Sequence, residues 1–249
     1  MTDLFDLLDG FVTQGKLEEV ERHARAALAD ADAEEAGDLW RYVAWSQFEQ
    51  GRLKEALTSA RRASDGLYEA KALFHQWDLP GAMQALSRFE GAGEDAAEAA
   101  WYRGVLCEFR GDPAEPHFAE AHRLAPELFA LPARLTDEEV DGVIRSAIAA
   151  LPPVLRRAVD ETVIEVCNLP KPHPDVDPLS MGLYHGMSRI ERDLEVSGLP
   201  PRILIYRLNI ERFAADRETA IDELRITLLH EVGHHLGFDE KGVADLGLE

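Results

Sequence analysis

The chain has 249 residues, of which 46% are hydrophobic and 29% are charged, a composition that indicates a folded protein rather than a disordered one. Its 47 acidic and 26 basic residues give a formal net charge of -21. Such a charge repels phosphate backbones and anionic lipid, so we expect neither a nucleic-acid partner nor a membrane partner.

The sequence contains few features that indicate a cellular compartment. The first residues, MTDLFDLLDGFV, lack the basic region of a signal peptide, and no apolar run in the sequence is long enough to span a bilayer. Cys107 and Cys167 lie far apart in the sequence, so we expect reduced thiols rather than a disulfide framework. These features predict a cytoplasmic protein.

The first half of the sequence repeats a pattern of two helices around a turn. Gly15 and Gly51 each separate two segments with helical apolar spacing, and the two glycines are 36 residues apart. A third, weaker unit covers 67–89 with its turn predicted at 80–81, and a fourth has its turn at 111–112. The pattern predicts an all-helical domain over residues 1–126.

These units resemble tetratricopeptide repeats. The second one, WRYVAWSQFEQGRLKEALTSARRA at 40–63, matches best, whereas the fourth fits only with about two residues inserted at its turn. The resemblance implies a short α-solenoid whose concave face binds a peptide or a partner protein. The alternative is that the helices only brace the rest of the chain.

The second half has mixed patterns. Residues 127–136 form a predicted connector, and a helix that Thr136 or Asp137 caps then leads to a proline pair at 152–153. Alternating β-branched segments at 161–169 and 202–208 predict strands. The last long helix is expected to begin near Asp216 or Arg217 and to end at Gly237. The fold class is therefore α+β, with a small α/β domain at 137–249.

That last helix contains the motif HEVGH. His230 and His234 are four residues apart, so they lie on one helical face about 40° apart around the axis, where two imidazoles can converge on one zinc ion. Glu231 follows the first histidine and is the candidate base that takes a proton from zinc-activated water and passes it to a leaving amine.

A third ligand is expected downstream of this helix. Gly237 can end the helix in a left-handed turn that brings the chain back to the site. Glu240 lies six residues past His234, where the pattern HExxHxxGxx(H/D) has its third ligand. We predict Glu240 for this role, with Asp239 and Asp245 as the alternatives and a water in the fourth position.

The C-terminal part resembles the small zincin-like metallopeptidases known as minimal zincins. The resemblance covers roughly 136–249 and is carried by AIAALPPVLRRAVDETVIEV, GLYHG, GLPPRILIYRLNIER and TLLHEVGHHLGFDE. It implies a short sheet packed on the active-site helix, a single zinc ion, His230 and His234 as ligands and Glu231 as base. Members of the family typically have Asp at the position of Glu240.

Other polar residues have competing interpretations. His235 points about 100° away from His234, which favours a packing or supporting role over ligation. Tyr184 and His185, in a predicted GLYHG loop, could stabilise an oxyanion, or the loop could simply cover the sheet. A solvated face is expected for the carboxylates Glu211, Asp216, Glu218, Asp222 and Glu223.

The sequence thus predicts a zinc metallopeptidase of the HExxHxxGxxE type that hydrolyses peptide bonds, with the helical domain binding a peptide substrate or a partner. One alternative is a repeat-based binding scaffold whose zincin fold holds metal without turnover. Another is an amidase or deacylase acting on substrates other than peptides, since the same motif serves all of these hydrolyses.

Overall fold

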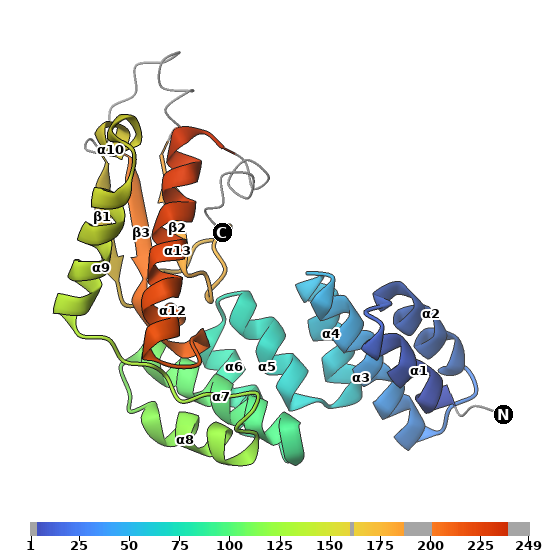
Figure 1. The fold of residues 1–249 in the computed structure, drawn as a ribbon. Helices are drawn as coiled ribbons and strands as arrows, with labels where there is room; N and C mark the ends of the chain where they lie inside the picture. The colour runs from blue at the N-terminus through green and yellow to red at the C-terminus, as the bar shows by residue number, and fades with distance from the viewer. Residues whose placement is uncertain (1–3, 160–161, 187–200, 239–249) are drawn as a thin grey trace. The chain divides into compact units, whose positions relative to one another are not determined.

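The computed structural model describes residues 4–159, 162–186 and 201–238, and it divides the chain into two compact units, Met1–Phe129 and Ala130–Glu249 (Figure 1). The first unit is helical and the second combines helices with a small sheet, so the predicted α+β class is confirmed. The predicted domain limits at 126 and 136 stay predictions. Within the described ranges, no helix has the length and apolar character needed to cross a membrane.

The first unit is built from helices that pack against their neighbours in sequence. Their bounds are α1 Leu4–Thr13, α2 Leu17–Ala27, α3 Ala33–Glu49, α4 Leu53–Ala63, α5 Gly66–His75, α6 Leu79–Leu86, α7 Gly93–Arg110 and α8 Glu115–Leu124. Close packing depends on small residues at the contacts: a Cβ added to Gly104 of α7 would lie only 2.6 Å from the ring of Phe118 on α8.

The turn after α1 recurs after α3. Gly15 and Gly51 both have positive φ, 64° and 70°, which glycine adopts without steric cost. The amide of the next residue closes each turn at 2.9 Å by donating to a carbonyl five residues back: Lys16 to Phe11, and Arg52 to Gln47. The helix–turn–helix pattern therefore recurs at the predicted offset of 36 residues, while the assignment to tetratricopeptide repeats stays a prediction.

The predicted turn at Pro80 and Gly81 is wrong. The chain reverses instead at Trp77, whose φ is 64°, and Asp78 then caps α6 by accepting a hydrogen bond of 2.9 Å from the amide of Gly81. Proline is tolerated in the first turn of a helix because its missing N–H has no helical partner there. Pro80 therefore lies in the first turn of a helix rather than in a turn between helices.

The second unit has a three-stranded sheet among its described residues. Its elements are α9 Asp137–Ala150, α10 Pro153–Val159, β1 Val163–Cys167, β2 Gly182–His185, β3 Arg202–Tyr206, α12 Arg207–Phe213 and α13 Arg217–Leu236. The strand order is β1-β3-β2, with β1 parallel and β2 antiparallel to the central β3. Helix α9 begins as predicted, because Thr136 and Glu139 form a reciprocal capping box.

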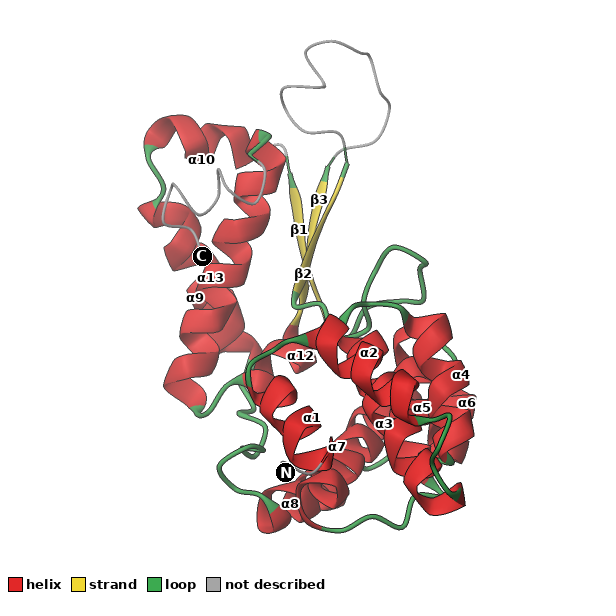
Figure 2. Ribbon diagram, turned by 90° about the vertical axis from the view of Figure 1, so that its right-hand side faces the viewer, coloured by secondary structure: helices red, strands yellow, loops and turns green. Residues whose placement is uncertain are grey.

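One face of the sheet carries the core of this unit. Ile203 and Ile205 of β3 are fully buried against α9 and α13, where Leu224 and Leu228 of α13 are also buried. Figure 2 shows α9 and α13 side by side on one side of the sheet. Strand residues alternate between faces, so Leu204, which lies between these two isoleucines, points to the other side.

Three predictions for this unit need correction. The strand predicted at 202–208 ends at Tyr206, because Arg207–Phe213 is the helix α12. The segment GLYHG was expected to form a loop, but Gly182–His185 is the strand β2, since it pairs residue by residue with β3. Glu211 was expected on a solvated face, but it is fully buried in α12. Its carboxylate accepts hydrogen bonds from Arg207 at 2.6 Å and from the Leu135 amide at 3.0 Å, and these partners compensate for its lost hydration.

The cysteines have the state that was predicted. Cys107 is buried in the first unit, Cys167 is half-buried on β1, and both are free thiols. Burial raises the pKa of both thiols.

Candidate metal centre

Helix α13 holds the histidine motif and has well-defined ends. Asp216 begins the helix by accepting a hydrogen bond of 2.8 Å from the amide of Thr219, and Gly237 ends it in the left-handed region with a φ of 93°. Leu228 and Val232 are completely buried, and they anchor one side of the helix in the core. These bounds agree with the sequence prediction.

The imidazoles of His230 and His234 converge. Their Nε2 atoms are 3.0 Å apart, their ring centroids are 4.7 Å apart, and both side chains are partly exposed. Two nitrogens bound to one tetrahedral zinc at about 2.0–2.1 Å would be about 3.3 Å apart. The observed spacing therefore fits a shared zinc ion after a shift of a few tenths of an ångström.

A backbone contact orients His234. Its Nδ1 lies 3.1 Å from the carbonyl oxygen of Phe238. A carbonyl can only accept, so in the neutral ring Nδ1 carries the proton and Nε2 presents a lone pair toward Nε2 of His230. This is the tautomer that metal ligation through Nε2 requires.

Glu231 faces the sheet from the same helix. Only 7% of its surface is exposed. A Cβ added to Gly182 on β2 would lie 2.7 Å from its Oε1 and 2.9 Å from its Cγ, so the carboxylate fills the space that the glycine leaves. Burial raises the pKa of Tyr206 to about 12, and the nearby Glu231 contributes to that rise. A carboxylate therefore lies between α13 and β2.

His235 is part of a different contact. It is 2% exposed, its Nδ1 is 3.3 Å from the hydroxyl of Tyr184, and its Nε2 is 3.2 Å from Oγ1 of Thr162. The packing role predicted for His235 is thus confirmed. Tyr184 pairs with the buried Ile203 and so shares the helix-facing side of the sheet, whereas His185 pairs with Arg202 and is exposed on the opposite side.

The predicted third ligand, Glu240, and its alternatives Asp239 and Asp245 lie outside the described residues. Across 4–159, 162–186 and 201–238, no group of three His, Cys, Asp or Glu residues could hold a metal ion. In the described part of the chain, His230 and His234 lie close together, and ligation by these histidines and by Glu240 stays a prediction.

A cavity of about 720 Å³ lies on the opposite face of the sheet. Its lining includes Leu183, Leu204, Tyr206 and Cys167 but none of His230, Glu231 and His234. This cavity is therefore separate from the histidine pair.

Comparison with known protein families finds a match in this part of the chain. Residues 158–248 match the zincin-like metallopeptidase family, and this stretch contains β1, β2, β3, α12 and α13. A search of curated proteins finds no match. The family likeness therefore covers the sheet and the histidine helix.

Sequence reasoning missed the part of the site that β2 provides. It placed Tyr184 in a loop and gave no role to Gly182, although the absence of a Cβ there makes room for Glu231. Leu183 and Tyr184 are compatible with a strand, but four residues carry too weak a signal to predict one.

Proposed function

We propose that the chain is a zinc-dependent metallopeptidase in which His230, His234 and Glu240 hold the metal and Glu231 is the catalytic base. One observation carries this proposal: the Nε2 atoms of the two histidines are 3.0 Å apart on one face of α13. The match of 158–248 to zincin-like metallopeptidases supports the same chemistry. Residue Glu240 enters the proposal from its sequence spacing alone.

Zinc bound at these residues would acidify a water and polarise a carbonyl oxygen. Glu231 takes a proton from the water that attacks the scissile carbonyl and passes it to the departing amine nitrogen, so the carboxylate is regenerated after each cycle. Its burial between α13 and Gly182 limits its side chain to few rotamers, and this holds the carboxylate ready for both transfers.

Of the two residues considered for oxyanion stabilisation, Tyr184 is the better supported. It lies on the side of the sheet that faces α13, two residues along β2 from Gly182, which makes room for Glu231. His185 points to the opposite face. We therefore propose that the Tyr184 hydroxyl donates a hydrogen bond to the oxyanion that forms as the carbonyl is attacked.

The helical unit is proposed to bind a peptide substrate or a partner protein. The alternative is a binding scaffold whose C-terminal unit holds zinc without turnover. The pocket between α1, α3 and α5 described below favours a binding role for the helices under either proposal. Because a purely structural zinc would not need a carboxylate beside its ligand, Glu231 favours the enzyme.

The zinc content of the purified chain tests the proposal. We expect about one zinc ion per chain, loss of the metal in His234→Ala, and weakened binding in Glu240→Ala. Glu231→Gln should keep zinc and lose turnover of a peptide library by about 10²–10⁴-fold. Failure of the parent protein to bind zinc at neutral pH would overturn the metallopeptidase proposal, and bound zinc without any turnover would favour the scaffold.

A further inference from the structure

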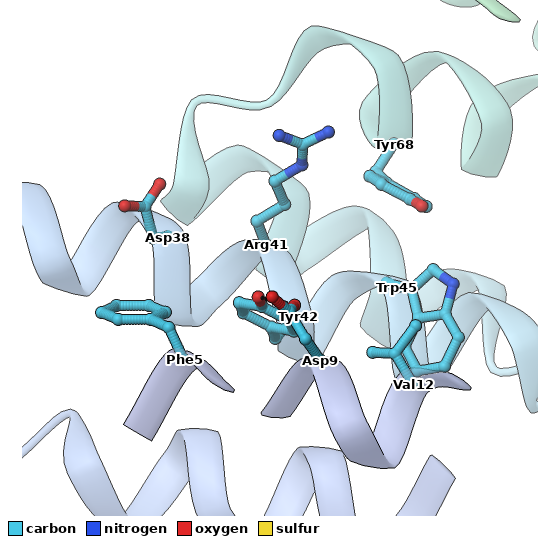
Figure 3. Close-up of a pocket in the computed structure, with 8 residues that line it drawn as sticks. All are labelled: Phe5, Asp9, Val12, Asp38, Arg41, Tyr42, Trp45 and Tyr68. Atoms are coloured by element: carbon cyan, nitrogen blue, oxygen red, sulfur yellow. Dashed lines mark hydrogen bonds between the residues drawn. The ribbon is translucent and has the colours of Figure 1, made fainter. Parts of the chain in front are cut away.

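A pocket of about 360 Å³ lies between α1, α3 and α5 of the helical unit (Figure 3). Its lining comes from positions that share one face of each helix, because residues spaced by three, four or seven lie on the same side. The residues are Phe5, Asp9 and Val12 from α1, Asp38, Arg41, Tyr42 and Trp45 from α3, and Tyr68 from α5. The pocket thus combines aromatic rings with carboxylates.

The positive charge of Arg41 is fully engaged by carboxylates. Its Nε lies 3.0 Å from Asp65, and its terminal nitrogen pairs with Asp95. In Figure 3 the guanidinium points away from Phe5, Asp9 and Val12. A second cation beneath Tyr68, Lys71, is likewise paired with Glu98 at 2.6 Å. The cations around the pocket therefore leave no excess positive charge for an anionic ligand.

Two more carboxylates line the pocket itself. Asp9 accepts a hydrogen bond from the Tyr42 hydroxyl, and both Asp9 and Asp38 are exposed to solvent. Burial raises the pKa of Tyr42, and Asp9 and Asp38 raise it further. Both negative charges therefore act on the same aromatic ring, so the pocket has a net negative potential beside an aromatic wall.

The aromatic wall favours a cationic group that can give up its surrounding water and contact the rings directly. Phe5 and Tyr42 have ring centroids 6.2 Å apart, and Trp45 continues this wall one helical turn further along α3. An ammonium or guanidinium group over such rings gains cation–π attraction, and its alkyl stem packs on apolar surface such as Val12.

We propose that this pocket binds the cationic side chain of a lysine or arginine within an extended peptide. The inference rests on the binding role proposed for the helical unit and not on the zinc chemistry. A volume of about 360 Å³ is near the lower end of the roughly 300–1,000 Å³ typical of ligand pockets, which suits one long side chain. Because Asp9 and Asp38 are exposed, the peptide backbone can continue past the pocket at this rim.

Titration calorimetry with capped pentapeptides tests this proposal. The peptides differ only at the centre, which is arginine, lysine, glutamine or citrulline, the uncharged isostere of arginine. The full chain carries Glu231→Gln, so hydrolysis does not consume the peptide and a failure to bind does not bear on the peptidase proposal. The pocket variant combines Asp9→Asn with Asp38→Asn, and the matched control is Asp6→Asn, an exposed aspartate of α1 outside the pocket.

We expect the arginine and lysine peptides to bind about tenfold or more tightly than the citrulline and glutamine peptides, since a charge-assisted contact is typically worth this much. The pocket variant should lose this preference and Asp6→Asn should keep it. Equal binding of charged and neutral peptides, or an equal loss in both variants, would overturn the proposal. A free alkylguanidine that bound as tightly as the arginine peptide would overturn the assignment to a peptide.

Discussion

The carboxylate of Glu231 occupies the space beside Gly182 on the neighbouring strand. A Cβ at Gly182 would lie 2.7 Å from Oε1 of Glu231 and 2.8 Å from Cγ2 of Thr227. One strand position without a side chain therefore allows the proposed base to stay buried between helix and sheet. This makes Gly182 a positioning residue for Glu231.

Gly182→Ala should disturb both stability and the site. The added methyl meets side-chain atoms close to the backbone, so we expect a loss of about 1–3 kcal/mol in the free energy of unfolding, which urea unfolding would measure. The control is Gly142→Ala in α9, where a Cβ has nothing within 4 Å. That change should stabilise the chain by about 0.5–1 kcal/mol. Equal effects of the two substitutions would contradict the role of Gly182.

A second prediction concerns Glu211, which links α12 to the segment before α9. Its buried carboxylate contacts Arg207 at 2.6 Å and Arg134 at 3.2 Å. Glu211→Ala leaves the buried amide of Leu135 without its acceptor and removes the partner of two arginines, so it should cost about 1–3 kcal/mol. The exposed Glu218 on α13 is the control, and Glu218→Ala should cost less than about 1 kcal/mol in the same urea unfolding experiment. A small effect of Glu211→Ala would show that the ion pairs contribute little.

The stability of the helical unit should vary with pH, and Glu21 of α2 should account for part of this variation. Burial alone would raise the pKa of this carboxyl, but hydrogen bonds from Arg52, Arg25 and Gln47 outweigh burial and hold the pKa below its usual range. A carboxyl with a lowered pKa in the folded state stabilises the protein above its unfolded pKa of about 4.3, and this contribution is lost as the pH falls through the folded value.

Glu21→Gln should therefore destabilise the chain by about 1 kcal/mol at pH 7, and the difference from the parent should shrink as the pH falls below about 4. Urea unfolding followed by circular dichroism at several pH values would measure this difference. Glu18→Gln, an exposed change on the same helix, should show no such trend. A difference that stayed constant with pH would show that the charge of Glu21 does not stabilise the folded state.

Long periodic segments and local turn signals allowed much of this fold to be predicted from the sequence. Asp216 and Gly237 mark the ends of α13 because capping and left-handed turns depend on the residue itself and its neighbours. The approach of His230 to His234 follows from helical geometry alone.

Features that depend on distant partners were not predictable in this way. From the sequence alone, Glu211 is expected to be a surface carboxylate. Only the fold brings it beside Leu135 and Arg134, which lie more than 70 residues earlier. The strand β2 is defined by pairing with β3 rather than by its own four residues. In the third unit, Trp77 occupies the turn position where the other units have glycine. The nearby Pro80 and Gly81 are residue types typical of turns, so the turn was predicted there instead.

The last prediction separates Tyr184 from its neighbour His185. If the Tyr184 hydroxyl stabilises the oxyanion, Tyr184→Phe should lower kcat by about 10²–10³-fold while KM and zinc content stay near those of the parent. His185→Ala should leave kcat unchanged, since His185 is exposed on the face of the sheet that points away from α13. Steady-state kinetics on a peptide that the parent cleaves would measure both. Loss of zinc together with activity in Tyr184→Phe would instead assign Tyr184 a structural role through His235, its hydrogen-bond partner at 3.3 Å.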